Sequence, residues 1–149
     1  MGSHPYTQRL LSKGAVMQNT AVVIRYHDAM IHKSADALAD LYTEDAVHEF
    51  PFTTPGLPPR FEGREKIRAG YRAMWGATPV RVEEIRNVVT YQATDPEVIV
   101  VEHEVVGTVG TAGHLFRVPG LLVLRVRDGR IVHCRDYMDA GGVAQARNT

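Results

Sequence analysis

The feature that most constrains the fold of this chain is a change of hydrophobic period part-way along it. Before residue 80 apolar side chains recur at helical spacing; after it come four long runs rich in β-branched residues, at residues 80–92, 97–110, 113–127 and 130–139. Short turn-forming segments separate the runs, and the Asp128-Gly129 pair between the last two is a strong hairpin signal. Helices followed by consecutive strands predict an α+β domain whose helices cover one face of a curved antiparallel sheet.

Two helices are predicted near the start of the chain. The first spans residues 16–32 and carries Tyr26 on its apolar stripe. The second begins after Ser34, a residue preferred at helix N-caps, and its apolar face continues through Leu41 and Tyr42. The two helices are expected to stack as a hairpin.

A short strand, a loop and a third helix are predicted next. The strand covers residues 46–52, and the loop at residues 53–59 contains three prolines and a glycine. This loop is long enough to serve as a lid over a pocket. The third helix opens at Gly63 and places Trp75 on its apolar face.

Charge and composition exclude several classes of protein. The 17 Lys and Arg residues balance 17 Asp and Glu residues, so no net field attracts a nucleic acid or an anionic membrane. No apolar run approaches the roughly 20 residues of a membrane-spanning helix. The single cysteine, Cys134, excludes an internal disulfide, and no zinc-site spacing surrounds it. We expect one cytoplasmic domain at residues 16–146, after a flexible segment at residues 1–15.

Strand alternation identifies polar side chains that share an apolar face. His103 and Asp136 each lie in a row of apolar residues, and His48 shares a face with Phe50. The first helix can lay Tyr26 over the sheet. We therefore predict that Asp136, His103, His48 and Tyr26 form the catalytic group of one pocket. Its predicted substrate-binding residues are Phe50, Trp75, Val101, Val105, Phe116, Val118, Leu122, Cys134 and Met138.

These residue types support proton transfer. A carboxylic acid in an apolar site holds its proton more tightly than in water, and histidine titrates near neutral pH. Tyr26 would donate a hydrogen bond to a developing oxyanion. The chain has no glycine-rich phosphate loop, GxSxG elbow or HExxH motif, so the chemistry it suggests uses no metal and no organic cofactor.

Each of these residues also has a purely structural interpretation. Asp136 would then pair with an arginine or be hydrogen-bonded at a strand bend, and the two histidines would be hydrogen-bonded core residues. Tyr26 would be a core aromatic residue with its hydroxyl group at the rim. The opposite sheet face presents His133, Arg135 and Tyr137, which suggest that it pairs with a second copy of the chain. We therefore expect a homodimer that binds a small apolar molecule.

Several stretches of the sequence resemble known families. Residues 20–26 with residues 37–45 resemble the opening of bacterial ketosteroid isomerases, and residues 17–146 as a whole resemble SnoaL-like polyketide cyclases and limonene-epoxide hydrolases. The residues Asp128-Gly129-Arg130-Ile131 and Arg135-Asp136-Tyr137-Met138-Asp139 resemble the final hairpin of the epoxide hydrolases and of many SnoaL-like proteins. These families belong to the NTF2-like superfamily, so the resemblance implies an NTF2-like fold with one pocket and a dimer through the outer sheet face.

The resemblance also implies roles for single residues. Tyr26 matches the oxyanion-hole tyrosine of the isomerases, whereas Phe50 occupies the position of their general base and a leucine near Leu122 that of their second aspartate. Asp136 matches the water-activating aspartate of the epoxide hydrolases, whose middle-strand Arg-x-Asp pair reads His103-Glu104-Val105 here. A SnoaL-like cyclase, in which a single aspartate works in an apolar cavity, matches best.

The resulting hypothesis is a cofactor-independent acid–base enzyme, of the cyclase, isomerase or hydrolase type. Its substrate would be a small, largely apolar molecule of the polyketide, terpenoid or steroid kind. The alternative hypothesis is a non-catalytic ligand-binding or dimerisation module of the same fold. An enzyme should bury Asp136 together with a histidine at the wall of a cavity. A module should tie Asp136 to an arginine and fill the cavity.

Overall fold

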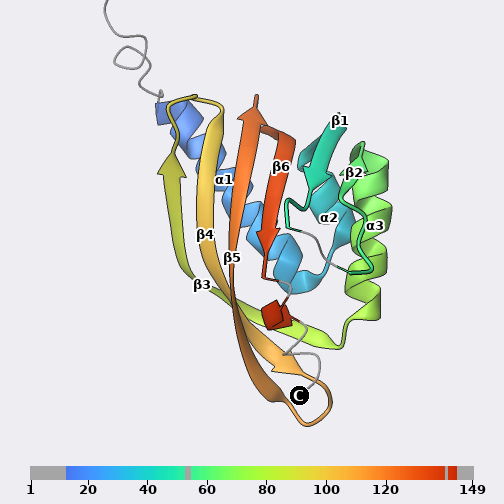
Figure 1. Ribbon diagram of the computed structural model, residues 1–149. Coiled ribbons are helices and arrows are strands. Elements are labelled where there is room, and N and C mark those ends of the chain that lie inside the picture. Colours follow the sequence, from blue (N-terminus) through green and yellow to red (C-terminus); the bar gives the residue numbers. More distant parts are fainter. Residues whose placement is uncertain (1–12, 53–54, 140, 144–149) are drawn as a thin grey trace, which may run out of the picture.

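The computed structural model describes residues 13–52, 55–139 and 141–143, and it confirms the α+β prediction (Figure 1). Helices come first and the long strands last. The elements are α1 (Lys13–His32), α2 (Ala35–Ala39), β1 (Tyr42–Glu49), β2 (Arg60–Glu62), α3 (Arg64–Ala77), β3 (Val80–Gln92), β4 (Val98–Val109), β5 (His114–Arg127) and β6 (Arg130–Met138). None of the helices in these described ranges is long and apolar enough to cross a membrane.

The strands form one curved six-stranded sheet in the order β2-β1-β6-β5-β4-β3. Strands β3 to β6 form the predicted antiparallel meander, and β2 pairs antiparallel with β1. The β1–β6 pair is parallel, so the sheet is mixed rather than wholly antiparallel as predicted. This pairing joins two distant parts of the chain, and it sets His48 of β1 beside Cys134 of β6.

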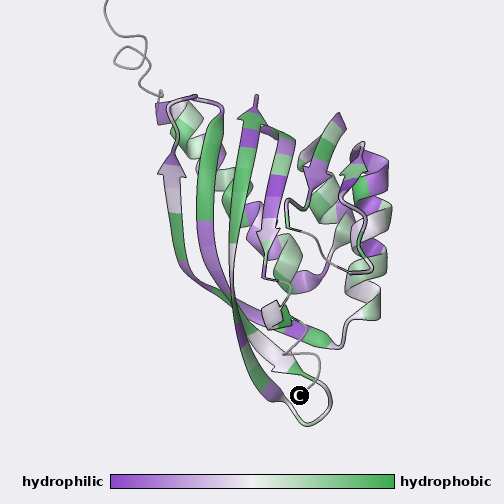
Figure 2. Ribbon diagram, viewed as in Figure 1, coloured by the Kyte–Doolittle hydropathy of each residue, from purple (hydrophilic) through white to green (hydrophobic). Residues whose placement is uncertain are grey.

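Helix α1 covers the inner face of the sheet and runs behind β4, β5 and β6 in the view of Figure 1. Its buried stripe includes Val22, Val23 and Tyr26, which pack with Leu122 and Leu124 of β5 in one core cluster. Figure 2 shows bands of hydrophobic and hydrophilic residues along the strands, as expected when one face is buried and the other faces solvent. The inner face therefore forms the core and the cavity described below.

The second helix begins as predicted but ends earlier. The Ser34 Oγ accepts a hydrogen bond from the Ala37 backbone N–H at 3.1 Å, so Ser34 is the N-cap. The prediction that the helix continues through Leu41 and Tyr42 is wrong. The Leu41 carbonyl accepts a hydrogen bond from the Ile131 backbone N–H at 2.8 Å, and Tyr42 begins β1. Pairing with β6 outweighs the local helical pattern because it satisfies these backbone groups in the sheet.

Strand β1 also differs from the predicted strand at residues 46–52, because it covers Tyr42–Glu49. The short strand β2 (Arg60–Glu62) was not predicted at all. Of the loop at residues 53–59, residues 53 and 54 lie outside the described residues. Helix α3 follows Gly63 as predicted, and Gly63 adopts a φ of 95°, which glycine tolerates readily.

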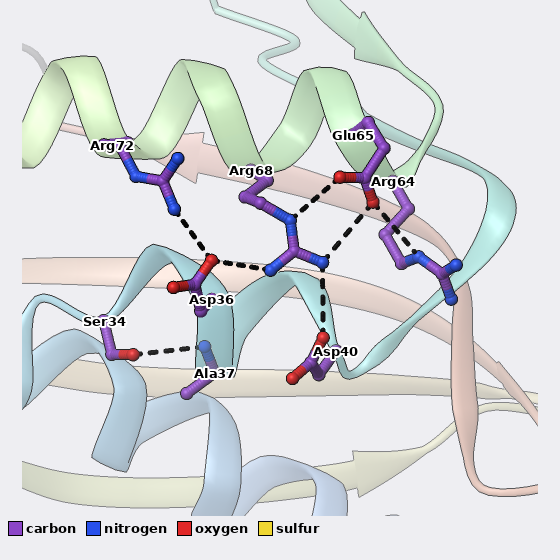
Figure 3. Close-up of polar contacts among 8 residues, drawn as sticks. All are labelled: Ser34, Asp36, Ala37, Asp40, Arg64, Glu65, Arg68 and Arg72. Carbon is purple, nitrogen blue, oxygen red and sulfur yellow. Dashed lines mark hydrogen bonds and ion pairs between the residues drawn. The ribbon is translucent and has the colours of Figure 1, made fainter.

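An exposed cluster of ion pairs fixes α3 against α2 (Figure 3). The Arg68 guanidinium donates to Asp36 at 2.7 Å, to Asp40 at 3.3 Å and to Glu65 at 3.0 Å, and Arg72 donates to Asp36 at 2.7 Å. These hydrogen bonds raise the pKa of Arg68 and lower that of Asp36. Solvent-exposed pairs contribute little stability. Their role here is to orient α3, which carries a tyrosine of the site.

Candidate functional site

A cavity of about 680 Å³ lies between α1, α3 and the inner face of β3 to β6. This volume is within the usual range for a small-molecule site. Most of its lining is apolar. The side chains with polar groups along it are Tyr26, Lys33, Tyr71, Trp75, Thr78, His103, Asp136 and Asp139. The loop residues Pro55, Gly56 and Leu57 also line it, so the segment predicted as a lid does border the cavity.

Asp136 of β6 is the carboxylate at the centre of the polar group. Its Oδ2 accepts a hydrogen bond from the Tyr71 hydroxyl group at 2.9 Å and lies 3.2 Å from His48 Nε2. The Asp136 side chain is 16% exposed, whereas the His48 side chain has no exposed surface. The carboxylate therefore reaches the cavity wall while His48 lies behind it.

His48 forms a buried ion pair with this carboxylate. Its Nδ1 lies 2.7 Å from the Tyr42 hydroxyl group, and its Nε2 lies 2.8 Å from the Tyr71 hydroxyl group. Burial disfavours the imidazolium, but Cys134 and the Asp136 carboxylate favour it more strongly, and the pKa of His48 rises to about 10. The imidazolium then donates from both ring nitrogens, from Nδ1 to the Tyr42 hydroxyl group and from Nε2 toward Asp136 and Tyr71, which holds these side chains in place.

Three tyrosines surround this ion pair in its buried pocket. Burial is the main cause that raises the pKa values of Tyr26, Tyr42 and Tyr71 well above the usual value of 10.0, and the nearby Asp136 adds to it. All three stay protonated at neutral pH and can donate hydrogen bonds. Tyr26 and Tyr71 line the cavity beside Asp136. The site thus combines a proton acceptor with neutral donors, the groups needed to remove a proton and stabilise the resulting oxyanion.

His103 lines the same cavity, but its hydrogen-bond partner is His27 of α1 rather than the Asp136 of the predicted group. His103 Nδ1 lies 3.0 Å from His27 Nε2, and the two rings meet edge to face at 4.9 Å. Burial lowers the pKa values of both, that of His27 to about 4. Gly120 makes room for this ring, because a Cβ there would lie 2.7 Å from His103 Nε2.

Comparisons with known proteins identify the family of the chain. Residues 23–134 match the SnoaL-like domain. The chain belongs to the SnoaL-like family. It is 33% identical over 116 residues to an uncharacterized PhzA/B-like protein of Pseudomonas aeruginosa, covering 76% of this chain and 80% of that protein.

Solved structures place the SnoaL-like chain in the NTF2-like, ketosteroid isomerase-like fold. A Bacillus subtilis protein to which isomerase activity has been attributed is 26% identical, with a TM-score of 0.79 over 89% of this chain and 94% of that one. A Catenulispora acidiphila protein with a ketosteroid isomerase-like fold is 23% identical, with a TM-score of 0.68 over 85% of this chain and 92% of that one.

The structure separates the predicted substrate-binding residues into two sets. Those that line the cavity of the SnoaL-like domain are Trp75, Val105, Phe116, Val118, Leu122 and Met138. Phe50, Val101 and Cys134 are not in its lining; they are buried in the core instead. Phe50 packs edge to face against His48 at 5.0 Å, so it supports the His48 ring from the core.

Four residues of the site were missed from the sequence. Tyr42 was predicted on the apolar face of the second helix, and Tyr71, His27 and Lys33 were not assigned a role. A hydroxyl group on an otherwise apolar helix face was the available signal for Tyr71. Among the residues that the structure describes, no group of three or more His, Cys, Asp or Glu side chains is arranged to hold a metal ion.

The His27–His103 pair predicts a loss of stability in acid. The folded-state pKa of His27 is about 4, below its usual 6.5, so the unfolded chain binds the proton first as the pH falls. The free energy of unfolding should therefore decrease between about pH 6.5 and pH 4. Urea unfolding across this range should show a shallower decrease in His27→Gln than in wild type. His32→Gln, at an exposed histidine, should keep the wild-type decrease, and equal slopes in all three proteins would contradict the assignment.

Proposed function

We propose that this SnoaL-like protein is a cofactor-independent acid–base enzyme for a small, largely apolar molecule of the polyketide, terpenoid or steroid kind. The observation that carries the proposal is the position of Asp136. Its carboxylate lies at the wall of a cavity of about 680 Å³ and is held there by a buried histidine and a buried tyrosine. A carboxylate held in a fixed position at the wall of an apolar cavity is one of the groups that can act as a general base.

Each group has a role in the proposed reaction. Asp136 accepts a proton from a carbon next to a carbonyl group, and the electron pair of the broken C–H bond becomes that of an enolate. The hydroxyl group of Tyr26 stabilises the enolate oxygen, while the Tyr71 hydroxyl group keeps its hydrogen bond to the Asp136 carboxylate. The proton returns to another carbon in an isomerisation. In a cyclisation the enolate carbon attacks a second carbonyl carbon, and the alkoxide formed there takes the proton back from Asp136. In a hydrolysis the same carboxylate takes a proton from water as the water oxygen attacks an epoxide carbon. The C–O bond of the ring breaks, and the released alkoxide takes the proton back from Asp136.

The alternative of a non-catalytic module has less support. A module was expected to tie Asp136 to an arginine and to fill the cavity. Within the described ranges, no arginine lies within ion-pair distance of Asp136, whose charged partner is His48. The cavity is open and bordered by a loop. Both observations favour the hypothesis of an enzyme over that of a non-catalytic module.

A thermal-shift screen tests the proposed function. Small epoxides, steroid enones and polyketide esters would be added to wild type and Asp136→Asn, because a ligand that binds only the folded state raises its stability by RT ln(1 + [L]/Kd). We expect one class to raise the melting temperature of wild type and to be turned over. If a class binds but is chemically unchanged, the non-catalytic alternative is correct, and if none binds, the cavity is not a site for these substrates.

We also propose that the outer sheet face pairs with a second copy of the chain. A shallow hollow of about 620 Å³ on this face is lined by Phe52, Pro119, Leu121 and Tyr137 together with Glu102 and Glu104. Phe52 is 59% exposed and packs against Tyr137 at 5.3 Å. Arg135 and Arg117 lie on the same face, so it carries apolar residues and charges of both signs. Such a face can be complementary to itself across a two-fold axis.

Light scattering at micromolar concentration should therefore give the mass of a dimer. Leu121→Arg, which places a charge in the apolar part of the hollow, should give a monomer with unchanged far-UV circular dichroism. Lys66→Arg, at an exposed site on α3, serves as the control and should remain dimeric. A monomeric wild type would contradict the proposal.

A further inference from the structure

Lys33 brings a positive charge to the wall of the cavity. It follows α1 directly, and among the described lining residues it is the single lysine or arginine. Its Nζ donates to the backbone carbonyl groups of Trp75 at 3.4 Å and Thr78 at 3.2 Å, at the C-terminal end of α3. The ammonium group is therefore held in a fixed position between two elements that border the cavity.

The backbone conformation at Lys33 favours glycine rather than lysine. Its φ of 50° is left-handed, and the Ser34 N–H bonds to the Ala29 carbonyl at 2.9 Å, as in the caps that end many helices. Glycine is the usual residue at this position because a side chain strains the backbone. The lysine is thus present despite an unfavourable conformation, and the reason for it lies in its side chain.

The charge of Lys33 has no carboxylate partner in the described part of the chain. Asp136 pairs with His48, and the Asp139 Oδ1 accepts the Gly142 N–H at 2.9 Å. The two carbonyl groups take two of the three N–H donors of the ammonium group and leave one for a further acceptor. Burial lowers the pKa of Lys33, which indicates a partly desolvated charge. An ammonium group in this state gains from an anionic oxygen brought into the apolar cavity.

We propose that Lys33 binds the carboxylate of an otherwise apolar ligand and so fixes the direction in which the molecule lies along the cavity. The proposal rests on the proposed function of the cavity and adds to it a substrate class, an apolar carboxylic acid. The carboxylate at Lys33 and the apolar body beside Trp75 would present a defined carbon to Asp136. If Lys33 served only to bond the carbonyl groups at the end of α3, the protein would bind an acid and its ester equally well.

The single tryptophan of the chain is a built-in reporter for this test. Trp75 lines the cavity, so its emission should change when the cavity is filled. The probes are cyclohexanebutyrate and its methyl ester, which share an apolar body and differ in charge. They would be titrated into wild type, Lys33→Met, Lys33→Arg and Lys33→Gly. Lys33→Gly suits the left-handed backbone, so it should fold even if methionine is not tolerated.

We expect wild type to bind the acid about tenfold or more tightly than the ester, a preference typical of a charge-assisted hydrogen bond. Lys33→Met and Lys33→Gly should lose the preference through weaker acid binding alone, and Lys33→Arg should keep most of it. Equal binding of acid and ester by wild type, or a preference that survives in Lys33→Gly, would overturn the inference and leave the proposed function standing. If neither probe binds, the inference is also overturned, and the thermal-shift screen then decides the proposed function separately.

Discussion

Asp136→Asn is expected to lower kcat by about 10²–10⁴-fold, the usual contribution of a general base. The amide has the size of the carboxylate, and its oxygen can still accept the hydrogen bond of Tyr71. It cannot take a proton from the substrate. Affinity should therefore change little, and the loss should appear in kcat rather than in the dissociation constant. Steady-state turnover and direct binding of the substrate class found in the thermal-shift screen would measure the two effects separately.

Asp128→Asn is the matched control for this variant. It removes the same charge from the same β5–β6 hairpin, at a turn residue with a φ of 52° that asparagine also tolerates. Its kcat should equal that of wild type. If Asp136→Asn keeps its kcat within about threefold of wild type while binding substrate normally, Asp136 is not the base.

His48→Leu is expected to destabilise the fold by about 3–5 kcal/mol, the usual cost of removing one partner from a buried ion pair. The leucine would leave the Asp136 carboxylate without its charged partner and the Tyr42 hydroxyl group without its contact to Nδ1. Urea unfolding followed by circular dichroism would measure the loss. His114→Leu, at an exposed position on β5, should change the free energy of unfolding by less than about 1 kcal/mol.

The pH dependence of the free energy of unfolding shows whether the loss of stability in His48→Leu comes from the ion pair with Asp136. The pKa of His48 rises from 6.5 to about 10 on folding, so the folded state holds a proton that the unfolded state releases. Its contribution is complete below about pH 6.5 and is lost as the pH rises toward 10. Wild type should show this alkaline decrease and His48→Leu should not. An equal decrease in both, or a loss of less than about 1 kcal/mol in His48→Leu, would contradict the ion pair.

Much of the fold follows from local periodicity. The helices α1 and α3 and the strands β3 to β6 were predicted close to their bounds because each is long, and all of them except the edge strand β3 have a buried face. Elements that depend on distant partners were not. The end of α2 and the start of β1 are set by the parallel pairing of β1 with β6, which no local pattern encodes. Strand β2 covers only Arg60–Glu62, and three residues are too few to show the alternation of apolar and polar residues that predicts a strand.

The candidate site divides in the same way. Alternation placed His48 and Asp136 on inward faces, and the β1–β6 register then brings them together. Tyr71 could not be assigned because its role depends on where α3 lies over the sheet. The partner of His103 was misjudged for a similar reason, since the path of α1 over β4 places His27 against it. Periodicity identifies which face a residue is on, but the neighbours across that face depend on the packing of separate elements.

The most direct test of the central claim is deuterium exchange into a bound ligand that carries an acidic C–H bond next to a carbonyl group. Proton NMR in deuterium oxide would follow loss of that signal with wild type and with Asp136→Asn, and it requires no knowledge of the complete reaction. We predict that wild type exchanges the proton at least about a hundredfold faster than Asp136→Asn, at one face of the carbon only. Equal rates in the two proteins, with the ligand bound to both, would contradict a base at Asp136.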